Sequence, residues 1–421
     1  MNEDRKNQKD VMIGKEKYIY FQDRFMERLD KTREMSDEEL AAEIDRFVVE
    51  QGREHCLDLS NKEKLRKYLL NSLRGLDVLQ DLLEDESITE IMVNGPEHIF
   101  VEREGKVEQW PGSFTSGEKL EDVIQQIVAK VNRVVNDTVP MTDARLADGS
   151  RVHVILAPVA INGPILTIRK FSSRPVTMEQ LIAWGSITPE AADFLKLLVQ
   201  ARYNIFISGG TGSGKTTMLN ALSGFIPEQE RVITIEDSAE LKLEHIPNLV
   251  RLEARNKNLE GRNEITIRDL IREALRMRPD RIVVGEVRSA EALDMLQAMN
   301  TGHDGSLSTG HSNSTKDMLS RLETMVLTGT EIPLMAVRGQ IASAIDIMVH
   351  LSRFRDGSRK VVSIMEVTGL TDGEITLEPL YQYEEETEDG GAGGTVRGRL
   401  KATGRSLGNR EKLHHAGIAT V

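Results

Sequence analysis

A glycine-rich run between an apolar stretch and a helical pattern carries the clearest chemistry in this sequence of 421 residues. The run consists of Gly209, Gly210, Thr211, Gly212, Ser213, Gly214, Lys215, Thr216 and Thr217. It matches G-x-x-x-x-G-K-[ST], a pattern in which loop N–H groups and the N-terminus of the next helix surround phosphates. We expect Lys215 to reach the β- and γ-phosphates and the Thr216 hydroxyl to bind Mg²⁺. The run therefore predicts a site for ATP or GTP.

Two carboxylates follow apolar, β-branched runs beyond this loop. Glu236 follows the run RVITI, and Glu286 follows the run RIVVG. Acidic side chains after parallel strands lie at the ligand-binding edge of a sheet. The second run has the Walker B arrangement with glycine where many such enzymes have aspartate, so we expect Glu286 to orient the attacking water or to bind Mg²⁺, directly or through water. Glu236 is expected to position metal or water, with Glu240 as a further candidate, and Lys215 completes the predicted catalytic set.

Two histidines lie among Gly, Ser and Thr residues beyond the second run. His303 stands in TGHDG and His311 in STGHS. We expect His311 to form a hydrogen bond with the γ-phosphate or with a carboxylate near it, and we take both histidines as nucleotide-site candidates. No further His or Cys stands at a spacing that would complete a zinc site.

The elements that must position these groups divide the chain into four segments. Residues 1–74 are charged and helical in pattern, with a capping box that starts at Ser36. Residues 75–172 predict a small α+β domain, and residues 173–383 alternate strands and helices as in a parallel α/β sheet. Residues 384–421 are predicted to be a flexible acidic, glycine-rich stretch followed by a basic, solvated tail.

Composition limits the classes of partner and location. The chain has 54 Lys plus Arg against 67 Asp plus Glu, a net charge of −13, and 4% aromatic residues. Proteins that bind nucleic acid need basic surfaces and often stacking aromatic side chains, so no specific nucleic-acid partner is expected. The single cysteine, Cys56, excludes an intrachain disulfide. No apolar run reaches the roughly 18 residues of a membrane-spanning helix, and the N-terminus lacks a signal-peptide core, so we expect a cytoplasmic protein.

Four sequence boxes in this order resemble the traffic ATPases of type II and type IV secretion and pilus systems. The boxes are GGTGSGKTT, ITIEDSAEL, LRMRPDRIVVGEVR and TGHDGSLSTGHSNS. The similarity extends from about Asp77 to Tyr381. Within this superfamily, NGPEHIFVEREGKV, DARLADGSRVHVILAPVAINGPILTIRKF and the tail ending AGI look most like the Flp (tight-adherence) pilus assembly ATPases. The absence of a four-cysteine zinc module disfavours the type II secretion branch, and the extension formed by residues 1–74 disfavours retraction motors.

The resemblance implies a RecA-like P-loop NTPase domain, a smaller α+β PAS-like domain before it, and an N-terminal helical extension. It implies a homohexamer that uses ATP and Mg²⁺ and drives an inner-membrane platform protein of a pilus or secretion system. Such a motor works at the cytoplasmic face of the inner membrane and associates with the membrane through partners only.

The resemblance also assigns roles to individual residues. It places Glu236 in an Asp box, Glu286 in an atypical Walker B motif, and His303 and His311 in a His box. Arginines of the smaller domain would reach the nucleotide phosphates, which suits the forked donors of a guanidinium. By motif position these are Arg151 and Arg169, with Arg145 as a third candidate.

Three other functions compete with a pilus motor. One keeps the ATPase and changes the cargo to protein or DNA exported by a type IV secretion system. Another is a RecA-like helicase or recombinase, which the charge balance opposes. The last is a nucleotide-sensing scaffold without turnover, which requires both Glu236 and Glu286 to be idle.

Overall fold

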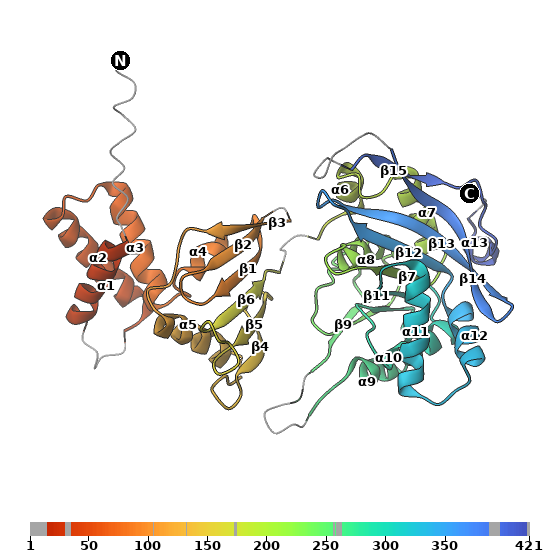
Figure 1. Cartoon of the computed structure of the whole chain (residues 1–421), viewed down its shortest axis with the longest axis horizontal. Coiled ribbons are helices and arrows are strands. Elements are labelled where there is room, and N and C mark those ends of the chain that lie inside the picture. The colour runs from red at the N-terminus through yellow and green to blue at the C-terminus, as the bar shows by residue number, and fades with distance from the viewer. Residues whose placement is uncertain are drawn as a thin grey trace, which may run out of the picture. The chain divides into compact units, whose positions relative to one another are not determined.

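The computed structural model describes residues 15–29, 35–103, 105–131, 133–171, 175–255, 257, 263–386 and 396–418. The chain forms two compact units, Met1–Ser173 and Arg174–Val421 (Figure 1). Residues 172–174, at the predicted boundary between the second and third segments, lie outside the described residues. None of the described helices is both long enough and apolar enough to cross a membrane.

The first unit begins with three helices, α1 (Lys15–Arg28), α2 (Asp37–Glu54) and α3 (Leu59–Leu73). The predicted capping box starts α2, because Ser36 Oγ accepts the Glu39 N–H and the Glu39 side chain accepts the Ser36 N–H. The apolar faces of the three helices form one cluster. Its fully buried members include Phe21, Phe25, Ile44, Leu65 and Leu69. These helices agree with the helical pattern predicted for the start of the chain.

The rest of the first unit is an antiparallel sheet with the strand order β3-β2-β1-β6-β5-β4. Its strands are β1 (Ile88–Asn94), β2 (Ile99–Arg103), β3 (Lys106–Trp110), β4 (Met141–Arg145), β5 (Arg151–Ile155) and β6 (Ile165–Arg169). Two helices accompany it, α4 (Leu79–Glu84) and α5 (Gly117–Ala129), and α5 buries an apolar stripe in the core of the sheet. This is the α+β arrangement expected from the sequence, and its PAS-like character stays a prediction.

The second unit contains a nine-stranded sheet with the order β15-β14-β13-β12-β7-β11-β10-β8-β9. The six strands from β12 to β9 run parallel, and β13, β14 and β15 add antiparallel pairs at one edge. The strands are β7 (Ile205–Gly209), β8 (Val232–Glu236), β9 (Leu249–Glu253), β10 (Arg281–Val284), β11 (Leu307–His311), β12 (Ile347–Arg353), β13 (Arg359–Thr371), β14 (Glu374–Glu385) and β15 (Gly398–Ala402).

Two apolar clusters cover the two faces of this sheet. On β7, Ile205 and Ile207 belong to one cluster and Phe206 to the other, as the alternation of side chains along a strand requires. The first cluster includes α6 (Met178–Ala183), α7 (Pro189–Gln200) and α8 (Lys215–Ser223). The second includes α9 (Ile267–Ala274), α10 (Glu291–Asn300), α11 (Thr315–Gly329) and α12 (Leu334–Ala344). Helices on both faces of a mostly parallel sheet make this unit an α/β domain.

The C-terminal segment is folded, so the prediction of a solvated tail is wrong for residues 396–418. This segment adds β15 to the sheet and ends in α13 (Glu411–His415), with Leu400, Leu407 and Leu413 buried in the core. Residues 387–395, which hold most of the predicted acidic, glycine-rich stretch, lie outside the described residues.

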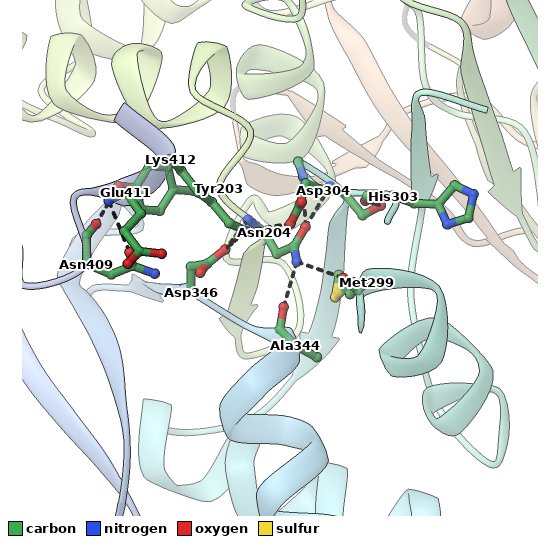
Figure 2. Close-up of polar contacts among 12 residues, drawn as sticks. Tyr203, Asn204, Met299, His303, Asp304, Ala344, Asp346, Asn409, Glu411 and Lys412 are labelled. Carbon is green, nitrogen blue, oxygen red and sulfur yellow. Dashed lines mark hydrogen bonds and ion pairs between the residues drawn. The ribbon is translucent and has the colours of Figure 1, made fainter. Parts of the chain in front are cut away.

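Acidic side chains of the second unit bind Lys412, which explains why the basic C-terminal segment packs against the sheet. Lys412 Nζ lies 2.7 Å from Asp304 Oδ1 and 2.7 Å from Asp346 Oδ2 (Figure 2). Asp346 Oδ2 also accepts the Asn204 N–H at 2.8 Å, and the Asn204 side chain accepts the N–H group of Gly305 at 2.8 Å. The sequence pattern does not reveal these partners because they lie far from Lys412 along the chain.

We expect Lys412→Met to lower the free energy of unfolding by about 1–3 kcal/mol, because Asp346 would keep its buried carboxylate and lose its cation. Burial already raises the pKa of Asp346, which shows that its charged form depends on its partners. Denaturant unfolding of the full chain measures the change. The matched control is Lys401→Met, which breaks an exposed pair with Glu384 and should change stability by less than about 0.5 kcal/mol. Equal stability of the two variants would contradict the anchoring role of Lys412.

Candidate active site

The predicted phosphate loop connects β7 to α8, with every residue of β7 buried. Gly214 caps the N-terminus of α8 with φ +93°, a left-handed conformation that glycine adopts without strain. The helix then begins at Lys215, so its first N–H groups face the loop. This is the strand, loop and helix arrangement that a phosphate site requires.

Lys215 is buried, and hydrogen bonds hold its ammonium group beside the loop. Its Nζ lies 3.0 Å from the carbonyl oxygen of Gly210 and 3.1 Å from His311 Nδ1. Because an ammonium group only donates, Nδ1 of His311 is the acceptor of this bond.

His311 connects Lys215 to Glu286. It ends β11, opposite Gly209 at the end of β7, and its Nε2 lies 2.9 Å from Glu286 Oε1. With Nδ1 as an acceptor, the ring proton lies on Nε2. Glu286 Oε1 is buried and accepts no hydrogen bond from the described residues, so this contact is close without the geometry of a hydrogen bond. Burial lowers the pKa of His311, and the positive charge of Lys215 adds to this effect, so the ring is neutral near pH 7. The structure places His311 beside a carboxylate, and its hydrogen bond to the γ-phosphate or to a carboxylate near it stays a prediction.

Glu286 also contacts Arg288, an arginine that was not predicted to belong to the site. Arg288 Nη2 lies 3.0 Å from Glu286 Oε2, and Arg288 Nη1 lies 3.3 Å from Asp237 Oδ2. Glu286 therefore lies between a neutral histidine and a guanidinium group. In the sequence, the local sign of this pair is that Glu286 stands two residues before Arg288, shortly after a buried strand.

Glu236 ends β8 and is buried beside Gly285. Its Oε1 accepts the N–H groups of Glu240 at 2.9 Å and Leu241 at 3.0 Å, while Oε2 is buried with no hydrogen-bond partner among the described residues. A Cβ atom at Gly285 would lie 3.0 Å from Glu236 Cγ, so glycine in place of aspartate leaves room for this side chain. Burial raises the pKa of Glu236 to about 7. Glu240 contributes its backbone N–H to this arrangement.

Glu236→Gln should raise the free energy of unfolding at pH 8 by about 1–3 kcal/mol. The unfolded chain releases this proton near 4.5 and the folded protein releases it near 7, so the wild type loses stability as pH rises through that window. The glutamine variant cannot ionise and avoids this loss. Unfolding measured from pH 4 to pH 8 tests the difference, with the exposed Glu244→Gln as control. Parallel pH profiles for wild type and Glu236→Gln would show that the pKa of Glu236 is not raised.

The two arginines assigned to the first unit lie next to each other on its sheet. Arg151 on β5 is paired with Arg169 on β6 and, on its other side, with Arg145 on β4. Directly paired residues share one face of a sheet, so the three form a cationic row. Their contact with nucleotide stays a prediction, because they belong to the other unit.

His303 lies away from the cluster formed by Lys215, His311 and Glu286. It precedes β11, whereas His311 ends it, so about 13 Å of strand separates the two ends. His303 Nδ1 lies 3.3 Å from the carbonyl oxygen of Ala298, and its ring points away from Asn204 (Figure 2). The expectation that both histidines join one nucleotide site within the chain is therefore corrected. A shared motif does not place both histidines at the same end of a strand.

A match to a family model places this arrangement among known proteins. Residues 72–382 match the model described as "Type II/IV secretion system protein". The chain belongs to this family. Within the type II/IV secretion family it is an ATPase, and a nucleotide is its substrate. The match includes the glycine-rich run from Gly209 to Thr217 in the α/β unit.

Individual members and folds support the same membership. The conjugal transfer protein TrbB of Rhizobium radiobacter is 32% identical over 78% of this chain and 98% of its own. The type IV secretion system protein PtlH of Bordetella pertussis is 36% identical over 70% of this chain and 95% of its own. The crystal structure of the pilus retraction motor PilT with bound ADP has a TM-score of 0.51 at 19% identity, covering 71% of this chain and 84% of that one. This last likeness concerns the fold alone.

Proposed function

We propose that this chain is the subunit of a homohexameric motor that hydrolyses ATP to power pilus assembly or secretion through an inner-membrane platform protein. The observation that carries the proposal is the chain of contacts from Lys215 through His311 to Glu286 beside the phosphate loop. These groups bring an amine, an imidazole and a carboxyl group together beside the loop, which suits phosphoryl transfer to water.

The proposed hydrolysis uses residues of the second unit. Residues Gly209 to Thr217 surround the phosphates, and Lys215 moves its N–H donors from Gly210 and His311 to the β- and γ-phosphates. Glu286 accepts a hydrogen bond from the attacking water and takes its proton as the new bond to the γ-phosphorus forms. The bond from that phosphorus to the bridging oxygen breaks, and ADP leaves. His311, which loses its Lys215 donor when phosphate is present, reports nucleotide state to Glu286.

The site fits Mg²⁺ through oxygen donors of this chain. The described residues hold no cluster of three or more His, Cys, Asp or Glu side chains suited to a metal, but Mg²⁺ usually binds through one or two carboxylates together with substrate phosphates. The buried Oε2 of Glu236 lacks a partner among the residues described, so an oxygen-seeking cation suits this corner of the site. Thr216 and Glu286, the latter directly or through water, would hold the ion. When bound, Mg²⁺ neutralises charge on the β- and γ-phosphate oxygens.

The cationic row of the first unit supplies the coupling in this proposal. Arg151 and Arg169, with Arg145 beside them, would bind the phosphates of ATP as the two units close and release them after hydrolysis. A row of guanidinium groups suits a polyphosphate, because each group presents a rigid fork of donors. In a ring of six subunits, this opening and closing would move a membrane partner. The motor would be cytoplasmic and recruited to the inner membrane through that partner.

A type IV export motor is the second candidate, and the names of two relatives favour it. TrbB is named for conjugal transfer and PtlH for type IV secretion. The match to this chain extends over more than nine-tenths of the length of each relative. This supports export of protein or DNA as the cargo, whereas Flp pilus assembly rests on the resemblance alone.

The mass of the assembly in solution and the pilus assembly and export activity of cells test the proposal. With ATP and Mg²⁺ and the slowly hydrolysing Glu286→Gln variant, sedimentation should give a species of about six chains, and a monomer at every concentration would contradict the ring. In cells that carry the gene, replacing it by Lys215→Ala should stop assembly of surface pili or release of exported protein. Loss of pili with normal export identifies pilus assembly, and the reverse identifies the second candidate. Normal levels of both would contradict a motor role.

A further inference from the structure

We propose that Arg359 and Arg353, the strand pair next to the turn of the β12–β13 hairpin, bind the nucleoside half of the nucleotide, opposite the catalytic end of the site. This rests on the proposed function, because it assumes that the loop from Gly209 to Thr217 holds the phosphates. Neither arginine belongs to a sequence box, and both come more than 130 residues after the loop.

The hairpin lies against the outer side of the phosphate loop. Arg359 Nε donates to the carbonyl oxygen of Gly212 at 2.8 Å. A Cβ atom at Gly214 would lie 3.6 Å from Arg359 Cδ, and one at Gly212 would lie 3.9 Å from Arg353 Nη1. Both side chains are therefore within van der Waals reach of the loop that surrounds the phosphates.

The strand order decides which end of the nucleotide the hairpin faces. β7 leads into the loop and has β11 on one side and β12 on the other. The γ-phosphate end belongs to the β11 side, where His311 ends the strand and Glu286 follows the next one. Neighbouring strands lie about 4.8 Å apart, so β12 lies about 10 Å from β11, which is the scale of a triphosphate chain. The nucleoside therefore leaves the loop on the β12 side.

The chemistry of the pair suits a nucleoside. Arg353 and Arg359 are directly paired across β12 and β13, which places two like charges side by side next to an anion site. A guanidinium group is planar and has five N–H donors, so it stacks on a base and donates to ribose oxygens. Among the described residues, the hydrogen bond of Arg359 uses only its Nε.

The tip of the hairpin is held in place before any ligand binds. Asp356 Oδ1 accepts the N–H and the hydroxyl of Ser358 at 2.9 Å and 2.6 Å, and Asp356 Oδ2 accepts the N–H of Val396 at 2.8 Å. Arg355, also in the tip, forms an exposed pair with Glu385 that adds little to this hold. A fixed hairpin loses little conformational freedom on binding, so its arginines add to affinity.

The test compares binding of ADP with binding of inorganic pyrophosphate, which has the phosphates without the nucleoside. The variants are Arg353→Gln and Arg359→Lys, the latter keeping a cation and a donor for Gly212. By calorimetry on the full chain, each should weaken ADP binding about tenfold and pyrophosphate binding less than about twofold. Arg355→Gln, in the same hairpin, should change neither.

The alternative outcomes are distinct. Equal weakening of ADP and pyrophosphate would overturn the proposal, because the arginines would then act on the phosphates or on the loop. Unchanged ADP binding in both variants would overturn it as well. If the wild-type chain bound neither ADP nor pyrophosphate, the proposed function itself would fail, independently of Arg353 and Arg359.

Discussion

Lys215→Ala is expected to reduce steady-state ATP hydrolysis by at least about 10²- to 10³-fold, the loss typical of removing one preorganised donor from a developing charge. Lys215 Nζ lies within 3.1 Å of the loop carbonyl of Gly210 and of His311, so no large movement is needed to reach phosphate. Phosphate release at saturating ATP and Mg²⁺ measures the effect.

Two control measurements show whether the loss of hydrolysis comes from the missing ammonium group of Lys215. Its free energy of unfolding should fall by no more than about 3 kcal/mol, because hydrogen bonds such as those from Lys215 to Gly210 and His311 contribute about 0.5–1.5 kcal/mol each. Because the charge of Lys215 lowers the pKa of His311, the variant should also raise that pKa, which NMR titration of the imidazole detects. Hydrolysis within about threefold of wild type would mean that Lys215 does not bind the reacting phosphates.

Glu286→Gln is expected to keep ATP binding and to lose hydrolysis by about 10²- to 10⁴-fold, the range for removal of a general base. Glutamine keeps the shape of the side chain, so the position beside His311 Nε2 stays filled. It cannot take a proton from water. Calorimetry for ATP binding and a phosphate assay for turnover separate the two effects.

The matched control for this variant is Glu273→Gln, an exposed glutamate paired with Arg276. It should bind and hydrolyse ATP as the wild type does. If Glu286→Gln hydrolysed ATP at the wild-type rate, the role of Glu286 would be wrong, and Glu236 would become the main catalytic carboxylate.

Local patterns were sufficient to predict the centre of the second unit. The apolar, β-branched run before Glu286 forms β10 (Arg281–Val284), which is buried throughout, as a central parallel strand is. The positions of Lys215 and Glu286 at the carboxyl edge follow from these elements, because each residue comes directly after a parallel strand or its loop.

Contacts between distant segments were beyond sequence reasoning. The bond from Arg359 to Gly212 spans 147 positions, and the bond from Lys412 to Asp304 spans 108. Neither pair has a periodicity or a motif, because the order of strands in the sheet brings them together. The basic C-terminal segment was predicted to be solvated because the sequence does not reveal the distant partners that hold it.

Burial and strand placement also determine the chemical environment of residues that the sequence did identify. Glu236 was expected to position metal or water, and burial at the end of β8 raises its pKa to about 7. His303 and His311 looked equivalent, and β11 separates them. Arg151 and Arg169 came from the family resemblance, and the pairing of β5 with β6 sets them side by side.

The central claim is that this chain turns over ATP through the site formed by Lys215, Glu286 and His311. Release of phosphate from ATP by the full chain with Mg²⁺, with the Lys215→Ala variant measured beside it, tests that claim most directly. We predict steady multiple turnover by the wild type and no turnover above background by the variant. Tight ATP binding by the wild type with no more phosphate release than Lys215→Ala would contradict the claim and identify a nucleotide-sensing scaffold.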